Sequence, residues 1–171
     1  MREIFRINDI IDLPVIDIES ARRVSTIRDV IIDLRENRIY ALICRERFIR
    51  RYTEAIAYKN VNLITQNSVG VTGRTERLNI RELCMKQRRF QSYNLILGKL
   101  VLGTHGEMLG VIRDLLIDTD TGIIKAYELS EGYLDDFLKG RKIISLEYGH
   151  KLSGKNLVQS DYNIQSSNLR Q

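Results

Sequence analysis

Apolar residues along this chain occur in short runs that polar turn residues interrupt. The most regular stretch is residues 97–129, where three apolar runs are separated by Gly103-Thr104-His105-Gly106 and by Asp118-Thr119-Asp120-Thr121-Gly122. Short runs rich in β-branched residues and bounded by Gly, Asp and Thr predict an antiparallel meander. The strands expected here and downstream are Lys99–Gly103, Met108–Asp118, Ile123–Leu129, Lys142–Leu146 and Asn156–Gln159.

A second version of this pattern lies 85 residues upstream. When residues 24–44 are aligned with residues 109–129 without a gap, seven of 21 positions are identical, and both copies contain Ile-Arg-Asp-x-x-Ile-Asp. Self-similarity of this kind indicates a duplication. The chain is therefore expected to be all-β, with two tandem small barrels. Gly110, within an apolar run, predicts the bend or bulge that a small closed barrel needs.

The pattern predicts four segments. They are a first, divergent barrel over 1–72, a basic linker over 73–94, a second barrel over 95–159, and a polar, flexible tail over 160–171. In the linker, Asn79 and Glu82 have the spacing of a capping box, which predicts a short helix over Ile80–Phe90. Another short helix is expected over Glu131–Leu138, and its counterpart in the first copy is the strongly basic Arg45–Glu54.

The second copy resembles a PRC-barrel domain, the small β-barrel named after the photosynthetic reaction-centre H subunit. The resemblance rests on Leu97-Gly98-Lys99, on Gly106-Glu107-x-Leu109-Gly110-x-Ile112-x-Asp114, and on Ile117-Asp118 with Gly122 and Ile124. The first copy resembles the same domain through Ile27-Arg28-Asp29, Ile32-Asp33 and Tyr58-Lys59-Asn60-Val61-x-x-Ile64. In the second copy, Leu129-Ser130-x-Gly132 and Gly140-Arg141-Lys142 look like bacterial two-copy PRC-barrel proteins of the YrrD type. The structural signature then comprises Asp29, Asp33, Gly106, Gly110, Asp114, Asp118 and Gly122.

The first copy departs from the family pattern at its first hairpin. It has Ala21-Arg22-Arg23 and Ser25 where the family usually has glycines. Because glycine tolerates positive φ and other residues are strained there, a different turn is expected in this copy.

The resemblance implies a fold more than an activity. Similar barrels occur in the reaction-centre H subunit, in the ribosome-maturation factor RimM, and in small proteins linked to sporulation. Their shared role is protein contact or scaffolding, and the family supplies no catalytic residue set and no cofactor. The chain is therefore expected not to be an enzyme.

The residues themselves suggest little chemistry. Asp118 to Gly122 begins like a calcium-binding loop, but Ile123 and Leu129 stand where that loop needs Gly and Glu, so a β-turn is expected. The two histidines, His105 and His150, lie in presumed turns without metal-site spacing. Asp29 and Asp114 are expected to accept backbone N–H bonds near a bend and so hold the barrel closed; the alternative is a contact surface.

Charge is the main functional hint. The net charge is +5, and residues 1–90 carry 18 Lys and Arg against 12 Asp and Glu. The residues proposed as a contact surface are Arg45, Arg47, Arg50, Arg51, Lys86, Arg88 and Arg89. With Phe48 and Tyr52, basic residues of this kind can bind RNA, or they can form a solvated or protein-binding face.

Two functions follow as predictions. The first is a non-enzymatic adaptor that binds a protein partner through a strand edge, a loop or the linker helix. The alternative is a factor that associates with RNA or the ribosome. The chain has neither an apolar run long enough to span a membrane nor a signal-peptide pattern. Cys44 and Cys84 fit neither a metal-site spacing nor a disulfide framework, so a reduced cytoplasmic location is expected, and a homo-oligomer is possible.

Overall fold

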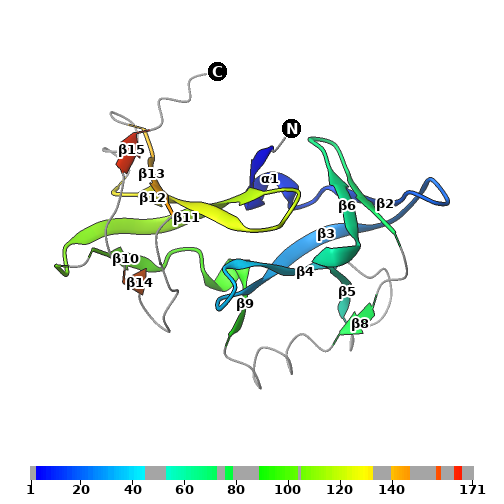
Figure 1. The fold of residues 1–171 in the computed structure, drawn as a ribbon, viewed down its shortest axis with the longest axis horizontal. Helices are drawn as coiled ribbons and strands as arrows, with labels where there is room; N and C mark the ends of the chain where they lie inside the picture. The colour runs from blue at the N-terminus through cyan, green and yellow to red at the C-terminus, as the bar shows by residue number, and fades with distance from the viewer. Residues whose placement is uncertain are drawn as a thin grey trace.

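The structure is a computed structural model that describes residues 3–44, 53–72, 76–78, 89–103, 105–132, 140–146, 157–158 and 164–166. These residues form two β-sheets with only short helical turns (Figure 1). The all-β prediction is therefore confirmed.

The elements follow the duplication. In the first half they are β1 (Ile4–Arg6), α1 (Ile7–Ile10), β2 (Pro14–Asp17), β3 (Arg22–Asp33), β4 (Arg38–Cys44), β5 (Thr53–Ala57), η1 (Tyr58–Asn60), β6 (Val61–Ile64), β7 (Val69–Val71) and β8 (Glu76–Leu78). In the second half they are β9 (Phe90–Ser92), η2 (Tyr93–Leu95), β10 (Leu100–Leu102), β11 (Met108–Asp118), β12 (Ile124–Ser130), β13 (Lys142–Ser145), β14 (Leu157–Val158) and β15 (Ile164–Ser166). The five strands expected in the second copy are all present, within two residues at each end.

The two sheets have matching orders. One runs β6-β7-β2-β3-β4-β5-β8, and the other runs β14-β10-β11-β12-β13-β15. The expected irregularity around Gly110 is present, because the β10–β11 register shifts between Val101 and Leu102. Gly110 has a φ of +137°, and a Cβ there would lie 2.7 Å from the Ser130 carbonyl oxygen. Only glycine allows the two backbones to approach this closely.

The first hairpin turn differs between the copies, as expected. Four residues link the paired Asp17 and Arg22, whereas three link Gly103 and Glu107. Ala21 nevertheless takes a φ of +54°, where Gly106 in the second copy has +81°. The first copy therefore keeps the left-handed residue of the turn without the glycine that favours it.

Each half gives its first strand to the sheet of the other half. β1 pairs antiparallel with β11, with Ile4 opposite Asp118, and β9 pairs antiparallel with β3, with Phe90 opposite Asp33. These registers coincide when the first half is shifted onto the second by 85 to 86 residues. In Figure 1 the blue N-terminal segment, including α1, accordingly lies beside β11.

Hydrogen bonds continue this exchange beyond the strands. The Thr119 N–H donates to the Glu3 carbonyl at 3.2 Å, and the Leu34 N–H donates to the Arg89 carbonyl at 2.8 Å. The two bonds are equivalent under the same shift. The exchange is thus reciprocal, and neither half completes its long strand without the other.

The turns that follow β3 and β11 meet at the centre of the molecule. The Ile39 N–H donates to the Gly122 carbonyl at 2.8 Å, and the Ile124 N–H donates to the Asn37 carbonyl at 2.9 Å. The two bonds are again related by a shift of 85 residues, and Arg38 forms a bridge with its own counterpart, Ile123. The halves are therefore related by an approximate two-fold axis at these turns.

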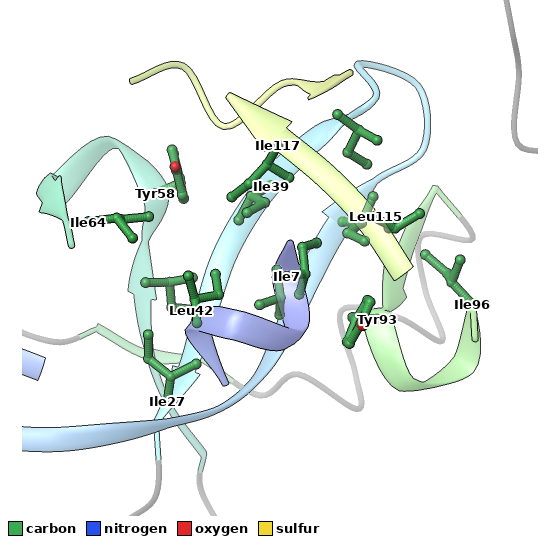
Figure 2. Close-up of a cluster of buried hydrophobic side chains, with 14 of the residues drawn as sticks. Ile7, Ile27, Ile39, Leu42, Tyr58, Ile64, Tyr93, Ile96, Leu115 and Ile117 are labelled. Atoms are coloured by element: carbon green, nitrogen blue, oxygen red, sulfur yellow. The ribbon is translucent and has the colours of Figure 1, made fainter. Parts of the chain in front are cut away.

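The exchange produces one hydrophobic core from both halves. Ile27, Leu42 and Tyr58 of the first half share a buried cluster with Leu115 and Ile117 of the second. Figure 2 shows β11 of the second half crossing β3 and β4, with Ile7 of α1 between them. We conclude that the duplicated halves form a single packed unit.

Some local predictions were wrong. Phe90 and Glu54 lie in strands β9 and β5 rather than in helices, because each segment pairs with a long strand of the first sheet. In the predicted flexible tail, Ile164–Ser166 form β15, with Ile164 opposite Ile144. The predicted linker contains β8 and β9 as well. The central parts of the predicted helices, residues 79–88 and 133–139, lie outside the described residues.

Candidate functional site

Two equivalent aspartates fold the turns at the centre of the molecule. Asp33 Oδ1 accepts the backbone N–H groups of Arg35 (2.9 Å) and Glu36 (3.4 Å). Asp118 Oδ1 accepts those of Asp120 (3.1 Å) and Thr121 (3.0 Å). Burial would raise the pKa of Asp118, but the hydrogen bonds from Thr121 and Asp120 outweigh it, so this pKa is lowered. The Asp118 carboxylate thus accepts N–H groups of its own turn, which agrees with the expected β-turn rather than with a calcium-binding loop.

A second pair of aspartates binds the exchanged segments. Asp29 Oδ1 accepts the Val30 N–H at 2.8 Å, and its Oδ2 accepts the hydroxyl of Ser92 in the exchanged strand β9. The sequence predicts that Asp29 accepts a backbone N–H bond near a bend. The Val30 N–H bond is of this kind, because the β3–β4 register shifts between Ile27 and Asp29.

The equivalent Asp114 makes a larger set of contacts. Its Oδ1 accepts the N–H of Leu115 (2.7 Å), the hydroxyl of Tyr93 (2.8 Å) and the N–H of Asn8 (3.3 Å). Asn8 belongs to the exchanged helix α1, so Asp114 also fixes a segment of the other half. A structural role in closing the fold accounts for all of these contacts.

A buried ion cluster lies next to Asp114. Glu128 pairs with Asp114 across β11 and β12 and is 3% exposed. Its carboxylate meets Arg6 Nε at 2.9 Å and Arg141 Nη1 at 3.5 Å. The first half lacks this cluster, because Ile43 stands at the position of Glu128 and Ser92 at that of Arg6. The fold of the first half therefore forms without such a cluster.

Sequence reasoning did not find this cluster. Glu128 and Arg6 were not singled out, although a glutamate inside the otherwise apolar run of β12 is a usable signal. Arg6 could not be recognised as its partner, because the pairing depends on the strand exchange.

Burial raises the pKa of Asp114, against the effect of its hydrogen bonds. The folded state then holds the proton to a higher pH than the unfolded chain, so stability falls as pH rises from the unfolded pKa, near 3.8, through the folded pKa. We expect Asp114→Asn, which keeps the accepting oxygen, to remove this fall and leave stability at pH 7 undiminished. Asp114→Ala should cost about 3 kcal/mol at pH 7, because three donors lose their acceptor.

Urea unfolding at pH 4 and pH 7 measures both variants. If Asp114→Asn loses as much stability as Asp114→Ala at pH 7, the charge itself is required and the expectation is wrong. Asp9, an exposed carboxylate of α1, provides the control, since Asp9→Asn removes a nearby carboxylate and keeps the acceptor of the three donors to Asp114.

Most of the predicted basic contact surface lies outside the described residues, namely Arg45, Arg47, Arg50, Arg51, Lys86 and Arg88. Arg89 is described. Its guanidinium lies 3.4 Å from Asp33 Oδ2 and stacks 4.5 Å from the centre of the Phe90 ring. His105 lies exposed in a turn, whereas His150 is also outside the described residues. The grouping of these basic residues on one surface remains a prediction.

A groove of 490 Å³ lies where the two halves meet. Its walls are the β6–β7 hairpin, from Leu63 to Asn67, and the β11–β12 turn with Glu3. Leu63 is 59% exposed, and Asp120 and Glu3 place carboxylates on the opposite wall. The groove therefore has an acidic wall opposite a wall on which the exposed Leu63 lies beside the polar Thr65, Gln66 and Asn67.

Comparison with known proteins agrees with this architecture. The PRC-barrel domain matches the chain twice, over residues 2–67 and 89–167. The chain belongs to the PRC-barrel family. The Uncharacterized protein YrrD of Bacillus subtilis (strain 168) is 25% identical over 131 residues, which span 77% of this chain and 72% of that protein. The predicted resemblance to two-copy proteins of this type is confirmed.

The family matches also describe the exchange. The first PRC-barrel match includes β1 and the second includes β9. Each of these strands pairs with the other PRC-barrel domain. In the part of the chain that the structure describes, no helix is long and apolar enough to cross a membrane.

Proposed function

We propose that this tandem PRC-barrel protein is a non-enzymatic adaptor that binds an extended segment of a cytoplasmic protein along strand β6. The observation that carries the proposal is the open edge of β6. Among the described residues β6 pairs only with β7, so its outer N–H and C=O groups are available to another strand. Addition of a strand to such an edge is a common mode of peptide recognition.

The composition of β6 favours this use. Sheet edges are usually protected by charged residues, proline or short length. β6 is short, at four residues, but its sequence Val-Asn-Leu-Ile includes neither a charge nor a proline. Leu63 is joined by Ile18, which is 49% exposed, and both side chains lie close to Gly70. The edge thus offers backbone hydrogen bonds beside an apolar patch.

The groove next to this edge supports a more specific proposal for the partner. Its acidic wall, with Glu3 and Asp120, favours Lys or Arg in the bound segment, and Leu63 favours an apolar side chain. The expected partner segment is therefore extended and alternates apolar with basic residues.

A capture experiment with matched variants tests the proposal. Affinity capture should recover a stoichiometric partner with the wild type and with Leu95→Lys, but not with Leu63→Lys. Leu95 is a suitable control because it is 67% exposed and lies in η2, outside the lining of the groove. A partner that binds both variants equally, or no partner at all, would count against the adaptor.

RNA or ribosome association remains the alternative, supported by the basic first half of the sequence. Phosphate contacts would make such binding fall steeply with salt. Cosedimentation with ribosomes at about 50 mM salt tests it, and absence of both sedimentation and RNA binding would reject it.

A further inference from the structure

A second pocket, of 340 Å³, lies in the first half and goes beyond the proposed adaptor function. It is formed by the start of β4, the η1 turn and the residue before β9. Basic and aromatic side chains line it, namely Arg38, Lys59, Arg89, Tyr40 and Tyr58. This volume is at the lower end of the roughly 300–1,000 Å³ typical of small-molecule sites.

The charge that faces this pocket is positive. Asp33 also lines it, but Asp33 accepts two backbone N–H groups and lies against Arg89, so its charge is largely compensated. Arg38 donates to the Thr121 carbonyl at 2.8 Å, a contact that holds the guanidinium without neutralising it. Lys59 is exposed. With Asp33 and Arg89 paired, Arg38 and Lys59 face one further carboxylate, that of Glu36, so the pocket keeps a net positive charge.

An aromatic ring stands beside these cations. Tyr40 is 36% exposed, and its ring lies 4.5 Å from the Phe90 ring, centre to centre. Phe90 in turn supports the Arg89 guanidinium. The ring of Tyr40 is therefore held in place while part of it remains open to a ligand.

The approximate two-fold axis provides an internal comparison. The counterparts of Arg38 and Tyr40 in the second half are Ile123 and Lys125, and the counterparts of Arg89 and Phe90 are Glu3 and Ile4. The second half forms the same strands and turns with one lysine, one glutamate and two isoleucines at these positions, so it has no arginine and no aromatic ring there. The basic and aromatic set is consequently not needed for the fold, which favours a role in binding.

We propose that this pocket binds a mononucleotide. Arginine and lysine bind phosphate through charge-assisted hydrogen bonds, and an aromatic face stacks on a base. Arg38, Lys59 and Arg89 contact the phosphate, and Tyr40 stacks on the base. The limited volume favours a single nucleotide over a longer chain.

Isothermal titration of the full chain tests the proposal with adenosine 5′-monophosphate, ribose 5-phosphate and inorganic phosphate. We expect saturable binding of the nucleotide with a Kd below about 1 mM. Lys59→Gln should weaken it roughly tenfold, because a charge-assisted contact is lost. Tyr40→Leu should weaken the nucleotide about tenfold but leave ribose 5-phosphate unchanged.

Two controls separate this site from other surfaces. Lys125→Gln, at the counterpart of Tyr40, and Leu63→Lys, at the proposed adaptor edge, should both leave nucleotide binding unchanged. Nucleotide binding that fails to saturate overturns the proposal, as does equal affinity for inorganic phosphate or equal weakening by Lys125→Gln. Binding of a short RNA without binding of the mononucleotide also overturns it.

Discussion

Gly122→Ala is expected to destabilise the protein by about 3 kcal/mol. Gly122 has a φ of +71°, which costs an alanine roughly 1–2 kcal/mol. A Cβ there would also lie 2.5 Å from the Tyr58 ring, and overpacking of this kind costs about 1–3 kcal/mol. Tyr58 cannot simply withdraw, because it is buried and its hydroxyl donates to the Thr119 carbonyl at 2.9 Å. The loss is measured as a change in the free energy of unfolding in urea.

Gly106→Ala is the matched control for this prediction. Gly106 has a similar φ of +81°, but a Cβ there would meet nothing within 4 Å. Gly106→Ala should therefore lower the free energy of unfolding by only about 1 kcal/mol, the cost of an alanine at positive φ. In the background of Tyr58→Leu, Gly122→Ala should lose part of its effect, since the ring that it strikes is absent. Equal costs at both glycines would show that the packing between the halves does not matter at this turn.

Arg6→Ser is the second large effect, with an expected loss of about 3 kcal/mol. It removes the closer of the two cations from the buried Glu128 carboxylate, and a buried charge that loses its partner typically costs about 3–5 kcal/mol. Arg141 remains near Glu128, so the lower end of this range applies. Arg141→Ser should cost less than about 1 kcal/mol, because Arg141 is half-exposed and more distant.

The first half provides the compensating change. It carries Ser92 and Ile43 where the second carries Arg6 and Glu128, so Arg6→Ser combined with Glu128→Ile copies the arrangement of the first half. We expect the double variant to recover most of the loss, since no unpaired charge is then buried. If the double variant is as unstable as Arg6→Ser alone, Arg6 contributes through packing rather than through its charge.

The sequence predicted the parts of the fold that depend on local patterns. Strand positions in the second copy, the bulge near Gly110 and the turn at Asp118 follow from alternation, glycine and Asp/Thr turn chemistry, which act over a few residues. The internal repeat also revealed the duplication. These features need no knowledge of which segments meet in space.

The strand exchange could not be predicted in the same way. β1 and β9 are three residues each, and nothing in so short a run specifies whether its partner strand lies in the same half or in the other. Phe90 was assigned to a helix because a capping box precedes it, whereas pairing with β3 decides its conformation. The Glu128 cluster and the pocket at Tyr40 depend on this exchange, so both became visible only in the structure.

The central claim is that the two PRC-barrel domains exchange their first strands, and hydrogen–deuterium exchange of two proline variants tests it most directly. Phe5→Pro removes a donor from β1, and Gln91→Pro removes one from β9. If the first strands are exchanged between the two domains, Phe5→Pro speeds hydrogen–deuterium exchange in residues 116–119. Gln91→Pro then speeds hydrogen–deuterium exchange in residues 31–34. If each strand pairs within its own domain, the two responses are reversed, and the account is contradicted.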